Sequence, residues 1–178
     1  MRATRTLLAA MVLGTAIGAS QANAQCGGAG TCTLTNTASV TVGALVKLGM
    51  GTAVTALTNP TADDVAAGNV LANDGPSFTI KANRSWTLKI KSQNAASWDY
   101  VGSYAGVKPI SDLAWSTGVG GTFAAITAAD ATFISGASST NGTLAQAFFR
   151  TSWTSDFTSA SNAPGAYSLP IVFTLTAP

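Results

Sequence analysis

The stretch GAYSLPIVFTLTAP, residues 165–178, decides the fold class. Its apolar side chains fall on alternate residues, namely Tyr167, Leu169, Ile171, Phe173 and Leu175. Period-two alternation is typical of a β-strand that buries one face. Pro170 cannot donate a ladder hydrogen bond, which favours an edge position or a bulge. The stretch therefore predicts a strand at the edge of a sheet.

The same alternation recurs along the chain between clusters of Gly, Ser and Asn. It is clearest over residues 40–48, 78–81 and 86–91, and shorter candidate strands cover residues 98–101, 113–116, 123–127, 131–134 and 144–154. Residues 61–67 are compatible with one helical turn, and residues 73–76 (NDGP) read as a tight turn. Eight or so short strands at regular spacing predict an all-β protein, a single antiparallel two-sheet sandwich with an immunoglobulin-like or jelly-roll-like Greek key.

The first 24 residues have the pattern of a secretory signal peptide. Arg2 and Arg5 precede a short apolar run over residues 7–19, and Ala22-Asn23-Ala24 provides a small-x-small cleavage site. The run is too short for a transmembrane anchor, which needs about 20 apolar residues. We expect cleavage after Ala24 and one β-sandwich domain over residues 25–178. The mature chain would then be secreted, periplasmic or on the cell surface.

The charge of the expected mature chain is balanced. After residue 24 it contains seven Lys or Arg residues and seven Asp residues. Nucleic-acid-binding domains normally carry a basic excess, so this balance argues against a nucleic-acid partner. A weakly charged surface leaves little repulsion between copies. We therefore expect partners to be further copies of the chain or another surface protein.

The composition also argues against an enzyme. The chain has no histidine, and no glutamate occurs in it, so the usual general bases are missing. Asp63 and Asp64 are adjacent and would point apart on a strand, which does not suit a glycosidase pair. Calcium bound by Asp63, Asp64, Asn73 and Asp74 is an alternative, but the spacing of a calcium loop is absent. We expect no catalytic activity, cofactor or metal.

The two cysteines, Cys26 and Cys32, lie close together in the segment CGGAGTC. In an oxidising compartment a disulfide between them is the natural interpretation, and it would fix the start of the first strand. Lipid attachment at Cys26 and a two-thiolate metal site are the alternatives. Gln25 does not suit the former, and the lack of histidine does not suit the latter.

Aromatic side chains suggest one candidate binding site. Trp98, Tyr100 and Tyr104 fall in a segment rich in Gly and Ser, where flat rings could stack on a sugar. The alternative is that these rings pack beneath a loop. Trp86 and Trp153 lie in alternating segments and are expected in the core.

Tyr167 follows the sequence Ala-Pro-Gly-Ala, which is similar to the tyrosine corner of Greek-key sandwiches. In that motif the hydroxyl hydrogen-bonds the backbone a few residues upstream. An ordinary core tyrosine at the start of a strand is the alternative.

Four features together resemble secreted bacterial β-sandwich surface proteins of the fimbrial and spore-coat-U type. They are the signal peptide, the small cysteine loop, the segment TCTLTNTASVTV (residues 31–42) and the final segment GAYSLPIVFTLTAP. The resemblance implies a structural β-sandwich subunit, self-assembling as in a pilus or coat. An extracellular carbohydrate-binding module is the alternative.

Overall fold

The computed structural model describes residues 26–68 and 73–178, so the expected signal peptide lies outside the described residues. The chain divides into two units, residues up to Thr41 and residues from Val42 to Pro178. The described part of the first unit, residues 26–41, forms neither helix nor strand and is exposed throughout. Whether residues 25–178 behave as one domain stays a prediction.

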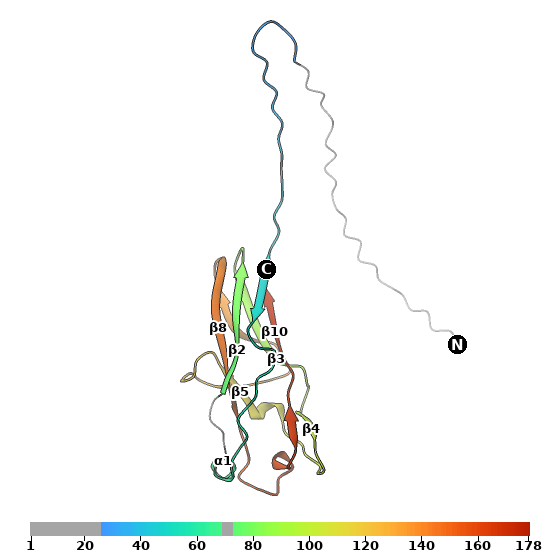
Figure 1. Cartoon of the computed structure of the whole chain (residues 1–178), viewed down its shortest axis with the longest axis vertical. Coiled ribbons are helices and arrows are strands. Elements are labelled where there is room, and N and C mark those ends of the chain that lie inside the picture. The colour runs from blue at the N-terminus through green and yellow to red at the C-terminus, as the bar shows by residue number, and fades with distance from the viewer. Residues whose placement is uncertain (1–25, 69–72) are drawn as a thin grey trace, which may run out of the picture. The chain divides into compact units, whose positions relative to one another are not determined.

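The second unit is an antiparallel two-sheet sandwich (Figure 1). The larger sheet has the order β1-β2-β8-β5-β6, and the smaller has the order β10-β3-β7. The strands of the larger sheet are β1 (Val46–Met50), β2 (Asn73–Ala82), β8 (Thr140–Thr151), β5 (Leu113–Ser116) and β6 (Ala124–Ala125). Those of the smaller sheet are β10 (Ile171–Thr176), β3 (Trp86–Ser92) and β7 (Ala131–Gly136). Every pairing is antiparallel, which confirms the predicted fold class.

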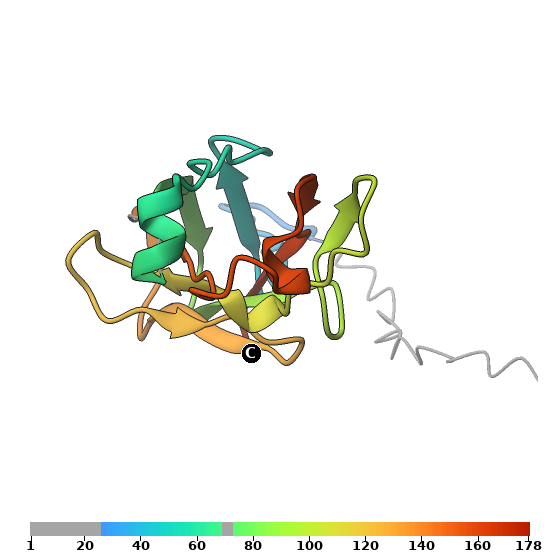
Figure 2. The same cartoon turned by 90° about the horizontal axis from the view of Figure 1, so that it is seen from below.

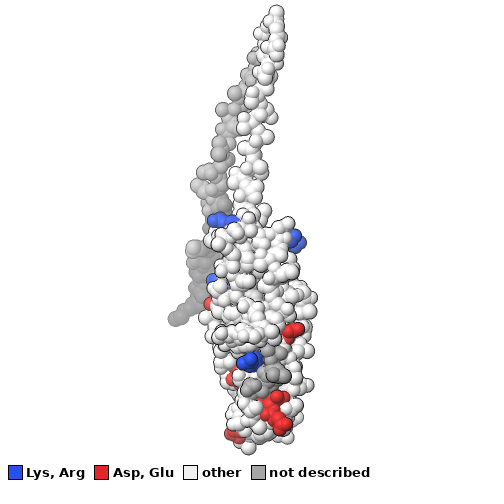
Figure 3. Space-filling view, turned by 90° about the vertical axis from the view of Figure 1, so that its left-hand side faces the viewer, with Lys and Arg blue, Asp and Glu red and all other residues white. Residues whose placement is uncertain are grey.

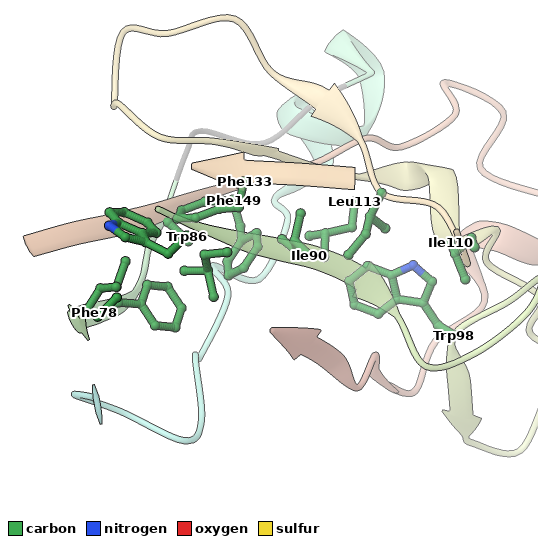
Figure 4. Close-up of a cluster of buried hydrophobic side chains, with 13 residues drawn as sticks. Phe78, Trp86, Ile90, Trp98, Ile110, Leu113, Phe133 and Phe149 are labelled. Carbon is green, nitrogen blue, oxygen red and sulfur yellow. The ribbon is translucent and has the colours of Figure 1, made fainter. Parts of the chain in front are cut away.

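Alternating side chains of the two sheets meet in one core (Figure 4). Trp86, Leu88 and Ile90 of β3 are buried, while the residues between them are partly exposed. From the facing sheet, Phe78 of β2 packs against Phe173 of β10, with ring centroids 4.5 Å apart. The core therefore arises from the period-two pattern that the sequence carries.

Short elements gather at one end of the sandwich, which Figure 2 shows from below. They are α1 (Ala62–Ala67), the 3₁₀ turns η1 (Ile110–Asp112) and η2 (Ala160–Asn162), and the two-stranded ribbon of β4 (Asp99–Val101) and β9 (Ala166–Ser168). Thr61 caps α1 and forms a reciprocal capping box with Asp64, and Gly68 ends the helix with φ of +82°. The helical turn expected over residues 61–67 is confirmed.

Several predicted boundaries are wrong. The strand predicted over residues 144–154 is β8, over Thr140–Thr151, and the one predicted over residues 123–127 is only Ala124–Ala125. The first strand begins at Val46 and not near residue 40, because pairing with β2 starts at Val46 opposite Ala82. Residues 73–76 do not form a free-standing turn. They open β2, and the register with β8 shifts between Asp74 and Ser77 where Gly75 and Pro76 interrupt the ladder.

The predicted final strand is in fact two strands. It divides at Leu169 and Pro170 into β9 and β10, and β10 is an edge strand, as Pro170 indicates.

Charged side chains are sparse on the face in Figure 3, where most atoms belong to other residue types. Lys89 and Lys91 on the outer face of β3 both approach Asp130, at 3.7 and 3.3 Å. Among the described residues, no helix has the length and apolar character needed to cross a membrane.

Candidate functional site: an open edge and an unpaired arm

At one of the edges of the sandwich, both sheets end without a shared strand. β1 is the outermost strand of the larger sheet and β10 the outermost strand of the smaller. The two strands come close to each other, yet no ladder joins them within the described residues. Each strand therefore keeps one edge of backbone N–H and C=O groups outside any ladder.

A cavity of about 990 Å³ lies where these two strands part. One wall is the segment that follows β1, from Met50 to Pro60, and the opposite wall runs from Asn162 to Ile171 and on to Phe173. The floor is formed by buried and partly buried residues, which are Trp98, Lys108, Leu113, Phe149, Thr151 and Trp153. The cavity is thus an opening into the space between the sheets, walled by backbone on both sides.

Lys108 is a buried cation on the floor of this cavity, with 1% of its surface exposed. Its Nζ donates to Asp112 Oδ2 at 3.0 Å and to the carbonyl oxygen of Ser152 at 2.6 Å. Nζ also lies 3.7 Å from the centroid of the Trp153 ring. Burial lowers the pKa of Lys108 from 10.5, and the hydrogen bond and charge of Asp112 oppose that shift. The lysine fastens η1 to the end of β8.

Three polar atoms of residues that line the cavity have no hydrogen-bond partner among the described residues. They are Thr151 Oγ1, Trp153 Nε1 and Asn162 Oδ1, and all three atoms are buried. An indole N–H needs an acceptor and an amide oxygen needs a donor. Each of these three buried atoms therefore has a hydrogen-bonding requirement that the described residues do not meet.

The tyrosine corner is present at the entrance to β9. Tyr167 Oη donates to the carbonyl of Ala163 at 2.8 Å, four residues upstream. Tyr100 Oη donates to the next carbonyl, that of Pro164, at 2.7 Å. The two tyrosines pair across β4 and β9 with ring centroids 4.9 Å apart. These contacts fix the wall of the cavity that leads into β10.

The segment before β1 has the pattern of a strand but no partner strand among the described residues. Over residues 33–44, one face carries Leu34, Asn36, Ala38, Val40, Val42 and Ala44. The other face carries Thr or Ser at every position except Gly43. Val40 is 88% exposed and Val42 is 65% exposed, and neither belongs to a strand. We call residues 33–44 the arm.

The chain runs in line with β1 as far as Gly43. Asn83, just beyond β2, donates from its backbone to the carbonyl of Leu45, and its side chain accepts from Leu45 N at 2.9 Å. The same side chain donates to the carbonyl of Gly43 at 2.9 Å. One residue thus holds the junction between the sandwich and the arm.

The predicted disulfide is confirmed, because Cys26 and Cys32 are bonded to each other. Its expected role at the first strand is wrong. β1 begins only at Val46, and the whole arm lies between Cys32 and that strand. The bond closes a small exposed ring at the N-terminal end of the arm.

The structure does not bring the three candidate sugar-binding rings onto one face. Trp98 is buried in the core, and its Nε1 donates to the carbonyl of Pro109 at 3.0 Å. Tyr100 is half-buried against Tyr167, and Tyr104 is exposed. Glycan binding stays a prediction that now rests on Tyr100 and Tyr104.

The expectation that Trp153 lies in the core is wrong, because Trp153 lies beyond the end of β8, is partly buried and lines the cavity. Lys108 is a residue of the site that the sequence analysis did not single out, since it shows no local pattern that would indicate burial. Both are placed by contacts with residues distant in sequence. In the part of the chain that the structure describes, no group of three or more acidic or cysteine side chains is placed to hold a metal ion. Asp63, Asp64 and Asp74, which were considered for calcium, form no such group.

Comparison with known proteins gives structural similarity only. No protein family matches the sequence, and no curated protein matches it. Among solved structures, the chain is similar to the P pilus rod subunit PapA, with 11% identity, a TM-score of 0.47, and coverage of 74% of this chain and 97% of that one. It is also similar to a chain from a chaperone-usher pilus solved to explain rod uncoiling, with 13% identity, a TM-score of 0.47, and coverage of 86% and 99%.

Proposed function

We propose that the mature chain is a structural subunit of a surface fibre or coat, and that copies join when the arm of one copy adds a strand to the open edge of the next. The observation that carries the proposal is the coexistence in one chain of an unpaired strand-like arm and an incomplete sandwich edge. Strand addition satisfies an exposed edge by backbone pairing and places alternate side chains in pockets.

The arm and the edge match in length. Twelve residues in extended conformation span about 40 Å. The wall from Gly165 through β10 to Thr176 is also twelve residues long and is continuous with the cavity. An added strand could therefore run the whole length of this edge.

The arm and the edge also match in chemistry. One face of the arm is apolar except at Asn36, and it would cover the side chains exposed between the sheets, such as Phe173. The opposite face, rich in Thr, would point to solvent.

The occupant is the arm of a second copy. Asn83 holds residues 43–45 in line with β1. For the arm to add to the β1–β10 edge of its own copy, the chain would have to reverse its direction directly before Gly43. Addition to another copy needs no such reversal, and it can repeat, since each copy carries both an arm and the β1–β10 edge. The result is an open chain of subunits outside the cytoplasm.

The test compares two charges placed on opposite faces of the arm. Val40→Asp puts a carboxylate on the inward face, whereas Thr41→Asp puts it on the outward face one residue later. We expect the wild type and Thr41→Asp to form multimers as concentration rises, measured by size exclusion with light scattering, and Val40→Asp to fail.

A mixture of Val40→Asp and wild-type protein tests the same proposal in a second way. Val40→Asp keeps an intact β1–β10 edge, so it should accept a wild-type arm. Because its own arm is not donated, it should end the chain and shorten the multimers. Wild-type protein that stays monomeric at millimolar concentration would contradict the proposal. Glycan-array binding that is lost in Tyr104→Ala would then favour the carbohydrate-binding alternative.

A further inference from the structure

The disulfide ring, residues 26–32, belongs to no helix or strand. All its residues are exposed, and neither cysteine is in the second unit. It stands instead directly before Thr33, where the arm begins. Its function therefore has to be sought in the arm.

The ring cannot continue a strand. Six extended residues would separate the Cα atoms of Cys26 and Cys32 by about 20 Å, whereas the disulfide holds them 6.0 Å apart. Gly28 and Gly30 have φ values of +148° and +134°, which other residues rarely adopt. The chain turns back on itself here, so a β-ladder that includes the arm has to end at or after Cys32.

The arm alone specifies its register weakly. Its inward side chains are small or medium-sized, and a slip of two residues replaces Val40 with Val42 or Ala38 while keeping the same face inward. A slip therefore changes the buried apolar surface by only a few methyl groups. Something besides the inward side chains is needed to select one register.

We propose that the Cys26–Cys32 ring is a stop at the N-terminal end of the donated strand. It ends the ladder at Thr33, and because it is wider than an extended strand it prevents the arm from sliding lengthwise through the groove of the neighbouring copy. This inference rests on the proposed function, since a stop has meaning only if the arm is donated.

The test uses the full mature chain in three forms. They are the wild type, the ring-opened double variant Cys26→Ser/Cys32→Ser, and Ala29→Ser, which alters the ring but keeps the disulfide. The thermal unfolding of the monomeric sandwich should be the same in all three, because the ring lies outside it. Hydrogen exchange with mass spectrometry then locates the first protected amide of the arm in the multimers.

In the wild type and Ala29→Ser we expect protection to begin sharply at Thr33 or Leu34. In the ring-opened variant the boundary should spread over several residues as registers mix, and multimers should dissociate on the order of tenfold faster, an effect on the off-rate. An unchanged boundary together with an unchanged dissociation rate would overturn the stop. Wild-type protein that never assembles would overturn the proposed function as well, so the two failures are distinguishable.

Discussion

At the scale of single residues, Lys108 contributes both to the stability of the fold and to the floor of the cavity. Its ammonium group is buried, and Asp112 is its ion-pair partner, with the carboxylate itself partly exposed. Removing the partner of a buried charge costs more than the pair contributes, because the remaining charge is then desolvated without compensation. The pair therefore keeps the floor of the cavity in one arrangement.

We predict that Asp112→Asn lowers the free energy of unfolding by about 2 kcal/mol near neutral pH. The folded-state pKa of Lys108 lies below its unfolded value of 10.5 and should fall further without Asp112. Between these two values the unfolded chain binds more protons, so stability rises with pH in this window. The deficit of Asp112→Asn relative to the wild type should therefore shrink as pH approaches 10.5, as measured by urea denaturation.

Asp130→Asn is the matched control for this prediction. Asp130 pairs with Lys89 and Lys91 on the surface, where ion pairs contribute at most about 1 kcal/mol. Its deficit should therefore be clearly smaller than that of Asp112→Asn near neutral pH. If Asp112→Asn lowers the free energy of unfolding equally at all pH values, the charged form of Lys108 is not destabilised by its burial.

At the scale of elements, α1 is tied to the groove through one backbone contact. The N–H of Trp153 donates to the carbonyl of Gly68, the residue that ends the helix. Trp153 in turn lies under Lys108 and lines the cavity. A helix of six residues depends on its caps for stability. Through the contact between Gly68 and Trp153, the caps therefore also support the lining of the cavity.

We predict that Thr61→Ala costs α1 about 1 kcal/mol of local stability, since it removes the side-chain acceptor of the capping box. Hydrogen exchange should speed up at the amides of the last helical turn and at Trp153. Exchange in β3, at the centre of its sheet, should be unchanged. Equal acceleration in β3 would show that the cap acts on the whole sandwich and not on the helix.

The elements also show what the sequence can and cannot predict. β5 occupies the predicted residues 113–116, and β3 extends the predicted alternation by one residue, since each strand buries one face against its own chain. Residues 40–45 alternate just as well, yet no strand forms there. Alternation indicates that a segment suits a sheet with one buried face. It does not indicate whether the strand that pairs with the segment belongs to the same chain.

The candidate site was predictable only in part, for a related reason. The edge position of the last strand followed from Pro170, and the structure confirms it. The cavity between β1 and β10 depends on how far these strands diverge, which residues 52–60 and 162–170 determine without any regular pattern. Lys108 lacks a local signal, because its burial results from Ser152, far along the chain.

At the scale of the whole molecule, the arm is free of charge. Residues 26–44 contain no Lys, Arg, Asp or Glu. Assembly through this arm would be governed by apolar burial and backbone pairing and not by electrostatic steering.

We therefore predict that assembly is nearly independent of ionic strength. Raising sodium chloride from about 0.05 to about 0.5 M should change the association rate by less than about threefold, because no charged pair has to be screened. Sodium sulfate should increase the extent of assembly by strengthening apolar burial. Light scattering over time measures both effects. A steep fall with sodium chloride would indicate contacts between charged surfaces outside the arm.

The clamp that Asn83 places on Gly43 and Leu45 has a mechanical consequence. Tension applied to the arm enters the sandwich in line with β1, along the direction of its ladder with β2. A force in that direction shears the hydrogen bonds of all five β1–β2 pairs together instead of peeling them apart one at a time. A chain of such subunits would be loaded in shear, the direction in which a β-ladder resists force best. Asn83→Ala, which removes the clamp, should lower the force at which the subunit unfolds.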